Sequence, residues 1–413
     1  MAWVVDRCSL TRSVGWVGAV VVWSALVVAS VDADDSMVAV PVGFAACDVL
    51  TFDPADGGVG GLAFTPDGDT IVHEGGTVRV HSAGGVDTLT TFDPPVFGSF
   101  LAVTPDGTSV LVGESSDNNI YRLPLAGGER VRIDNIRFNY SIAIDADGNG
   151  FVSAPNADFT LNQVWLIDGD PDTLSPPIVR DLPGFSGPLA VDAQGNLYYG
   201  TATLDCVESL FRFSRAQLQS AIMGTSLSVD DAETLITDAV GFAQMLYADD
   251  KLIFSELGFC TDPSVGRLWT VDLANNFLLE PQSEFSLAEG VLSPTFIAFQ
   301  PGPEPFAAGN GMDGGRLVVA SSDFIQLGKV TQIAPQLFFV RGRINGDLQV
   351  NVADVTSLLN FLFGGGSPPR PMEAGDVNDD GRLNIADVLY LLNFLFGSGP
   401  VISPPFPQPG PVS

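Results

Sequence analysis

The chain has 413 residues, of which 46% are hydrophobic and 16% charged, so it can bury the core of one large domain and a smaller one. Asp and Glu number 49 against 18 Lys and Arg, and the net charge of −31 disfavours binding to nucleic acids and anionic lipids. Because the hydrophobic fraction is too high for a disordered acidic chain, we expect a folded, solvated protein suited to binding cations.

The N-terminus has the layout of a secretory signal. Arg7 and Arg12 precede an apolar run over residues 14–29, and small residues around Ala33 provide a cleavage site. The run is also close to the lower length limit for a spanning helix, so an uncleaved membrane anchor is the alternative. Two acidic residues follow at once, which favours a signal peptide over residues 1–33, a secreted protein, and no membrane attachment once the signal is removed.

One sequence pattern recurs through residues 45–336. It consists of a short apolar strand, a turn that often contains Asp-Gly, and a second strand, and a third strand mostly follows. The six copies are Gly61–Glu74, Phe100–Glu114, Ser141–Asn156, Pro188–Thr201, Ala243–Glu256 and Thr295–Asp323. A period of roughly 40 residues with several strands per unit is typical of propeller blades. The pattern resembles six-bladed β-propellers of the NHL and gluconolactonase-like kind, so the resemblance implies an all-β six-bladed propeller and says little about function.

Oxygen-bearing side chains stand where the second strand of each repeat ends, and we expect these ends to meet at one mouth of the central channel. They are Glu74, Glu114, Asn156, Asp205, Glu256 and Asp323. Gluconolactonase-like enzymes place a Glu, an Asn and an Asp around a metal on this face. The resemblance therefore implies Glu114 or Glu74, with Asn156 and Asp205, as metal ligands, and a metal-dependent, lactonase-like hydrolase as an alternative function. Loops ordinarily contain polar residues, so these side chains need not share an ion.

The remaining motifs predict no catalytic residue. Cys206 and Cys260 fall in corresponding loops of adjacent repeats and are the expected disulfide pair, whereas Cys8 lies in the signal and Cys47 is left over. The sequence has no Cys/His metal spacing and no nucleophile elbow.

The segment DVNDDGRLNIAD, residues 376–387, has the spacing of a calcium-binding loop. Its ligand positions are Asp376, Asn378, Asp380, Arg382 through its carbonyl, Asn384 and Asp387. Gly381 stands where such a loop must turn with positive φ. The apolar residues that follow, at helical spacing, predict a helix from about residue 386 to 396.

A second copy of this cassette lies 33 residues upstream (376 − 343 = 33), with two departures. Arg343 replaces the first aspartate and Leu348 replaces the glycine. The ligand positions that remain are Asn345, Asp347, Asn351 and Asp354. Because arginine has no acceptor atom and leucine is strained at positive φ, we expect little or no calcium here, with Arg343 pairing with Asp347 or Asp354 instead.

Two loop-and-helix units with no helix before either loop resemble a type I dockerin, an EF-hand-like module, over residues 341–399. The resemblance implies antiparallel helices whose apolar faces cover each other, bound calcium, a cohesin-like partner, and an association with polysaccharide breakdown. Loop positions 10 and 11, where a type I dockerin presents hydroxyl groups, are apolar here: Val352-Ala353 and Ile385-Ala386. These apolar positions imply an apolar docking surface, or a partner unlike that of a type I dockerin. Alternatively, the two units are only a calcium-stabilised cap at the end of the chain. The proline-rich residues 400–413 are predicted to be disordered.

Together these patterns predict a secreted propeller that binds a carbohydrate or small molecule at one face and is tethered to an extracellular assembly by a calcium-dependent module. The ligand of the propeller is not identified by any motif.

Overall fold

The computed structural model describes most of the chain after residue 37. The described residues are 38–39, 44–52, 58–256, 267–273, 285–287, 294–300, 316–321, 328–335 and 338–411, without 83, 96–97, 115–117, 186, 204–206, 240–241, 249, 346–348, 370–371, 398 and 408–409. The expected signal peptide and the sulfur atoms of all four cysteines lie outside the described residues and side chains.

Among the residues that the structure describes, none of the helices combines the length and the apolar character needed to cross a membrane.

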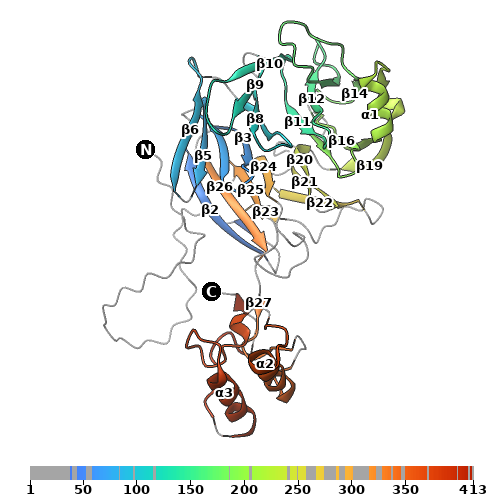
Figure 1. Ribbon diagram of the computed structural model, residues 1–413. Helices are drawn as coiled ribbons and strands as arrows, with labels where there is room; N and C mark the ends of the chain where they lie inside the picture. Colours follow the sequence, from blue (N-terminus) through green and yellow to red (C-terminus); the bar gives the residue numbers. More distant parts are fainter. Residues whose placement is uncertain are drawn as a thin grey trace. The chain divides into compact units, whose positions relative to one another are not determined.

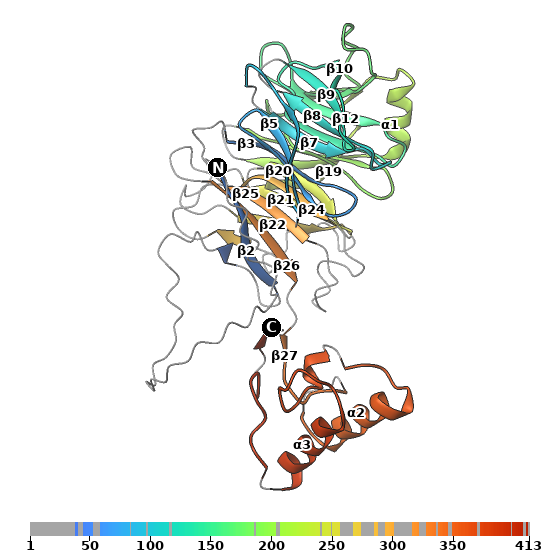
Figure 2. The same ribbon diagram turned by 60° about the vertical axis from the view of Figure 1, so that its left-hand side comes forward.

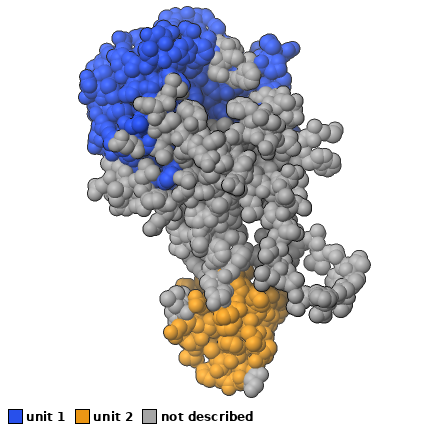
Figure 3. Space-filling model, turned by 180° about the vertical axis from the view of Figure 1, so that it is seen from behind, with its two compact units in different colours: residues 1–41, 46–301, 316–333 blue, residues 42–45, 302–315, 334–413 orange. Residues whose placement is uncertain are grey.

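The chain divides into two compact units (Figure 3). Unit 1 comprises residues 1–41, 46–301 and 316–333, and unit 2 comprises residues 42–45, 302–315 and 334–413. Unit 1 is a β-propeller and unit 2 contains the two helices of the predicted cassettes, so the expected fold class is confirmed.

The propeller sheets radiate from a common axis (Figures 1 and 2). The first two are β3 (Val59–Phe64), β4 (Thr70–Glu74), β5 (Thr77–Ser82), β6 (Gly85–Thr91), and β7 (Gly98–Val103), β8 (Ser109–Glu114), β9 (Asn119–Pro124), β10 (Val131–Asn135). The third is β11 (Ser141–Ile144), β12 (Gly150–Pro155), β13 (Asn162–Leu166), β14 (Val179–Leu182), with β18 (Leu227–Ser228) parallel to β14. The fourth is β15 (Leu189–Val191), β16 (Leu197–Gly200), β17 (Glu208–Phe213), β19 (Glu233–Ala239). The fifth is β20 (Phe242–Ala248), β21 (Lys251–Glu256), β22 (Arg267–Asp272), β23 (Phe285–Leu287), with β1 (Val38–Ala39) at its edge.

The last repeat differs from the others, and this corrects the prediction of six equivalent blades. Five blades each take four strands from one stretch of the chain, whereas the last repeat supplies three: β24 (Pro294–Gln300), β25 (Arg316–Ser321) and β26 (Gly328–Pro335). Its sheet is completed by β2 (Phe44–Phe52) from the N-terminal side. The structure therefore has five complete blades of the predicted kind, not six. The inner strands nevertheless contact one another in turn, and β24 meets both β20 and β3, so the ring is closed.

In the first four repeats, side chains of the turn between the two strands hold that turn by hydrogen bonds. In the fourth blade, Asp192 Oδ1 accepts hydrogen bonds from the N–H groups of Gln194 (2.9 Å) and Asn196 (2.8 Å), which closes an Asx turn. Gly195 has a φ of 84° there, which is why the repeat keeps a glycine at this point. The apolar residues before and after the turn then pair in register, Ala190 opposite Tyr198.

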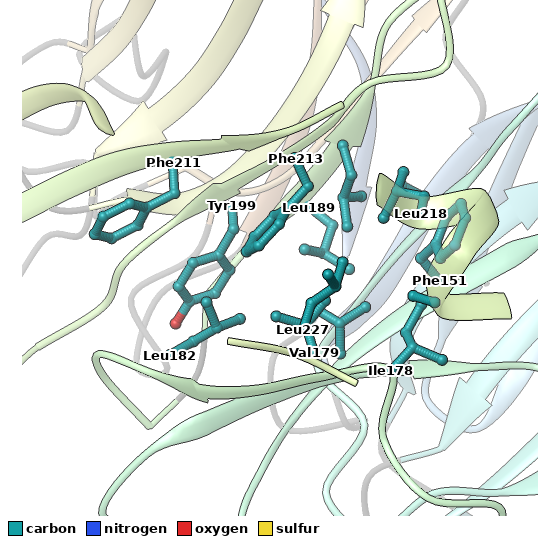
Figure 4. Packing of buried hydrophobic residues seen from close by; sticks show 14 residues of the cluster. Phe151, Ile178, Val179, Leu182, Leu189, Tyr199, Phe211, Phe213, Leu218 and Leu227 are labelled. Atoms are coloured by element: carbon teal, nitrogen blue, oxygen red, sulfur yellow. The ribbon is translucent and has the colours of Figure 1, made fainter. Parts of the chain in front are cut away.

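The core lies between neighbouring sheets. One cluster, shown in Figure 4, packs the third and fourth blades together with α1 (Arg215–Ile222), and it includes the buried Phe151, Leu189, Tyr199 and Phe213. Helix α1 begins with a capping box at Ser214 and is followed by β18 and the 3-10 turn η2 (Val229–Asp231).

Unit 2 contains α2 (Val352–Gly364), the 3-10 turn η5 (Met372–Ala374), α3 (Ile385–Phe396) and the short pair β27 (Phe338–Phe339) and β28 (Gly410–Pro411). Its core joins Val355 and Leu358 of α2 to Val388 and Leu391 of α3, so each helix covers the apolar face of the other.

The proline-rich tail is part of this core, which corrects the prediction that it is disordered. Ile402 is 2% exposed, the Tyr390 hydroxyl donates to Val401 O (3.0 Å), and the Phe394 and Phe406 rings meet edge to face at 5.3 Å. Composition alone missed this because two apolar side chains of a proline-rich stretch, Ile402 and Phe406, suffice to anchor it against the helices.

Candidate functional site

The second loop of unit 2 has the shape that its sequence predicts. Asp376 accepts the N–H groups of Asp380 (Oδ1, 3.1 Å) and Gly381 (Oδ2, 2.9 Å), and Asp380 Oδ1 accepts Arg382 N–H (2.8 Å). Gly381 has a φ of 76°, as position 6 of a calcium loop requires. These turns wrap the backbone around the side chains of the ligand positions, so the all-oxygen donor set of the loop fits a hard cation such as calcium.

Position 12 of the loop also starts the helix. Asp387 accepts the N–H groups of Asn384 (Oδ2, 2.9 Å) and Asn378 (Oδ1, 3.3 Å), and Asn384 caps α3 through Ala386 N–H (2.7 Å). Burial raises the pKa of the Asp387 carboxyl. The described part of the chain contains no group of three His, Cys, Asp or Glu side chains close enough to hold a metal. In the second loop the carboxylates accept backbone N–H groups.

The first loop starts α2 in the same way but differs at its ligand positions. Asp354 accepts three backbone N–H groups, from Ile344 (2.6 Å), Asn345 (3.0 Å) and Asn351 (2.9 Å). Arg343 makes no ion pair with Asp354, and its Nε is buried without an acceptor in the described structure. Of the two partners predicted for Arg343, Asp354 is not paired with it, and Asp347, like Leu348, lies outside the described residues, so the pairing stays a prediction.

Arg341 is the functional residue that sequence reasoning missed in unit 2. Its side chain is 7% exposed, and it donates to the carbonyl groups of Pro404 (3.0 Å), Glu373 (3.3 Å) and Asp376, and it pairs with Asp379 at 2.9 Å. One guanidinium thus joins the start of the module, the second loop and the tail. The only signal in the sequence is an arginine immediately before the first loop, which is weak.

Both helices keep an apolar stripe exposed, on faces that the helix–helix core does not use. The six residues of these stripes are Val352 (54% exposed), Leu359 (37%), Phe363 (72%), Ile385 (45%), Leu389 (55%) and Phe396 (73%). Leu359 and Phe363 are therefore not covered by the second helix, although the predicted module has helices whose apolar faces cover each other. Val352 and Ile385 are position 10 of the two loops, so the predicted apolar surface is present at the expected positions.

Two of the predicted mouth residues have partners within their own blades. Glu74 pairs with Arg79 (3.2 Å) on its own blade, and Asn156 Oδ1 accepts Thr160 N–H (3.0 Å) within its own loop. Asp205 and Asp323 lie outside the described residues, as does the side chain of Glu256.

Glu114 has a different neighbour from the one predicted. It is fully buried between the first two blades, with Oε1 3.6 Å from Nε2 of His73. Burial lowers the pKa of His73 to about 4, so the imidazole is neutral at pH 7. This pair is inside the packing between blades, whereas the predicted metal site requires an open mouth.

A cavity of about 780 Å³ lies on the propeller axis, among the inner strands β3, β7, β11, β20 and β24. Its walls reach Thr65 and Pro66 at the first Pro-Asp-Gly turn and Thr104 at the second. Because β4 runs antiparallel to β3, these turns are at the opposite end of the sheet from Glu74. The cavity therefore extends toward the face opposite the predicted mouth.

The comparisons with known proteins identify the C-terminal module. Residues 342–396 match the dockerin type I domain. Dockerin type I domains bind calcium, and calcium is the cofactor of this module. The match covers both loops and both helices of the module.

Solved structures resemble the propeller in fold alone. A gluconolactonase from Xanthomonas campestris is 13% identical with a TM-score of 0.46, covering 73% of this chain and 99% of that one. An aldose sugar dehydrogenase from Streptomyces coelicolor is 15% identical with a TM-score of 0.45, covering 71% and 99%. A virginiamycin B lyase from Staphylococcus aureus is 13% identical with a TM-score of 0.44, covering 70% and 99%. No curated protein matches the chain.

Proposed function

We propose that the protein is a secreted β-propeller binding protein that the dockerin module attaches, in a calcium-dependent manner, to an extracellular assembly associated with polysaccharide breakdown. The observation that carries this proposal is the second loop, whose turns, left-handed glycine and all-oxygen side chains suit calcium at Asp376, Asn378, Asp380, Arg382 O, Asn384 and Asp387. In the first loop Arg343 replaces the leading carboxylate, so calcium there is weak or absent.

The partner that fits is cohesin-like, with an apolar contact surface. The exposed stripes provide large side chains at matching positions of both helices, Val352 with Ile385 and Phe363 with Phe396. Exposed apolar residues grouped in this way indicate an interaction surface. Calcium acts indirectly, because the loop that it binds leads into α3 through the Asn384 cap and so fixes the direction of that helix.

The test uses the full chain and purified cohesin domains, with binding measured by biolayer interferometry in calcium and in chelator. We expect binding in calcium alone, its loss in Asp376→Ala, and a weakening of at least tenfold in Phe396→Ser. Leu174→Ser, an exposed leucine of the propeller, is the matched control and should bind as the unchanged protein does. Binding that persists in chelator, or that Phe396→Ser leaves intact, would contradict the proposal.

The alternative is a metal-dependent hydrolase with its metal at Glu114, Asn156 and Asp205. The described residues offer it little support, since Glu114 is buried against His73 and the amide of Asn156 is bonded within its own loop. The binding function is therefore the better supported of the two.

A further inference from the structure

Two exposed phenylalanines and one arginine form a cluster at one end of the third blade. Phe138 lies in the loop that leads from β10 into β11, and Phe159 lies in the loop between β12 and β13. The two rings meet edge to face with centroids 4.7 Å apart, and the Arg137 guanidinium carbon lies 4.9 Å from the Phe138 ring and 5.6 Å from the Phe159 ring. We call Arg137, Phe138 and Phe159 the aromatic cluster.

The backbone of this cluster adopts a strained conformation that no other bulky residue among those described adopts. Six described residues other than glycine have a left-handed φ, and four of them are Asn or Asp, which tolerate it: Asn118, Asp181, Asp250 and Asp379. The other two are Phe138, at 53°, and Phe159, at 59°. A bulky side chain gains nothing from that conformation, and such strain tends to persist at functional sites.

The strain is not offset by burial. Phe138 is 39% exposed and Phe159 is 42% exposed, so neither ring supports a core. Both loops are instead fixed by hydrogen bonds of their backbone: Phe138 N–H donates to Asn118 Oδ1 (3.0 Å), and Phe159 N–H donates to Asn156 O (3.2 Å). The fold thus holds two aromatic side chains rigidly in solvent at a cost in stability.

The guanidinium of the cluster has no ion-pair partner among the described residues. Arg79, Arg132 and Arg212 each pair with a carboxylate, but no described acidic side chain lies within ion-pair distance of Arg137. The phenyl rings order its side chain, while the N–H groups at its edge stay available. Next to Phe159, the fully exposed Asp158 accepts the Thr160 hydroxyl (2.6 Å) through Oδ1, and hydrogen bonds from Thr160 lower its pKa, so it is ionised.

We propose that the aromatic cluster is a binding site for an uncharged polysaccharide. A sugar ring has C–H faces that pack on phenyl rings and hydroxyl groups that both accept from Arg137 and donate to Asp158. The local charges of these two residues cancel, and the net charge of −31 disfavours a polyanion. Two half-exposed rings are also far smaller than the roughly 800 Å² per partner of a stable protein interface. The inference rests on the proposed function, because it names the ligand of the propeller that the dockerin module would tether.

The test is affinity electrophoresis of the full chain in gels that contain neutral soluble polysaccharides: xyloglucan, arabinoxylan, galactomannan or mixed-linkage β-glucan. Polygalacturonate serves as the charged probe. We expect at least one neutral polysaccharide to retard the protein. Phe138→Asn, Phe159→Asn and Arg137→Gln should each weaken that binding at least tenfold, and Leu174→Asn, an exposed residue of another loop, should not.

Asparagine suits the left-handed φ, so Phe138→Asn and Phe159→Asn should keep or raise the melting temperature while they lose binding. This separates a binding role from a structural one. The inference is overturned if no neutral polysaccharide retards the chain, if polygalacturonate alone does, if the variants bind like the unchanged protein, or if the asparagine variants melt at lower temperature. The gels contain chelator and no cohesin, so their outcome is independent of whether the dockerin tether works.

Discussion

Replacing Arg341 with methionine should strongly destabilise the dockerin module. The arginine is nearly buried, and its guanidinium donates to three carbonyl groups and pairs with Asp379. A hydrogen bond from a charged donor contributes about 1.5–3 kcal/mol, and its loss leaves the partner carbonyl unsatisfied. Because these bonds share one side chain they are not additive, and Asp379 is half-exposed. We therefore expect a loss of about 3–5 kcal/mol, less than the sum of the separate bonds.

The assay is differential scanning calorimetry of the full chain, read on the calcium-dependent transition. Arg341→Met should lower that transition in calcium, and it should weaken calcium binding, since the arginine also holds Asp376 O and Asp379 of the second loop. Arg382→Met is the matched control, because its side chain is exposed and its backbone carbonyl is retained. A change of less than 1 kcal/mol in Arg341→Met, or an equal change in Arg382→Met, would refute the assignment of Arg341 as the residue that joins the loop to the tail.

Three further predictions concern the core of the module, the blade interface and the loop. Ile402→Ala should destabilise the module by about 2–4 kcal/mol, the range for a buried aliphatic side chain, in chemical denaturation of the full chain; no change would mean that the tail does not pack. The contribution of His73 to propeller stability should be lost as pH falls from 6.5 to about 4, because burial keeps the folded imidazole neutral while the unfolded chain binds the proton. His81 and Asp134 also titrate in this window, so the measurement is the difference in slope between the unchanged chain and His73→Gln; it should approach ~1.4 kcal/mol per pH unit, and equal slopes would contradict the prediction. Gly381→Ala should weaken calcium binding through a cost of about 1–2 kcal/mol at positive φ, whereas Gly381→Asn should weaken it less, and equal effects would argue against strain as the cause.

The sequence predicted the propeller strands and the calcium cassettes because both rest on short-range patterns. The turn at Asp192 and the caps at Asn351 and Asn384 are formed by residues within four positions of each other, so spacing alone reveals them. The use of β2 to complete the last blade was not predictable from the repeated pattern, since it joins strands almost 300 residues apart that have no shared motif.

Fewer features of the candidate site than of the fold were predictable from the sequence. The apolar positions Val352 and Ile385 follow from loop numbering, and the structure leaves them exposed as expected. Arg341 and Ile402 could not be found in this way, because their roles depend on the tail folding back onto the helices. The same holds for Phe138 and Phe159, which read as ordinary apolar loop residues until their φ angles and their contact are known.

The most direct test of the central claim is a calorimetric titration of the full chain with calcium, repeated with Asp376→Ala. A single strong site that Asp376→Ala abolishes is the expected result, because the second loop keeps its leading carboxylate and the first has Arg343 in that place. Two equal sites, or a strong site that survives in Asp376→Ala, would contradict the account.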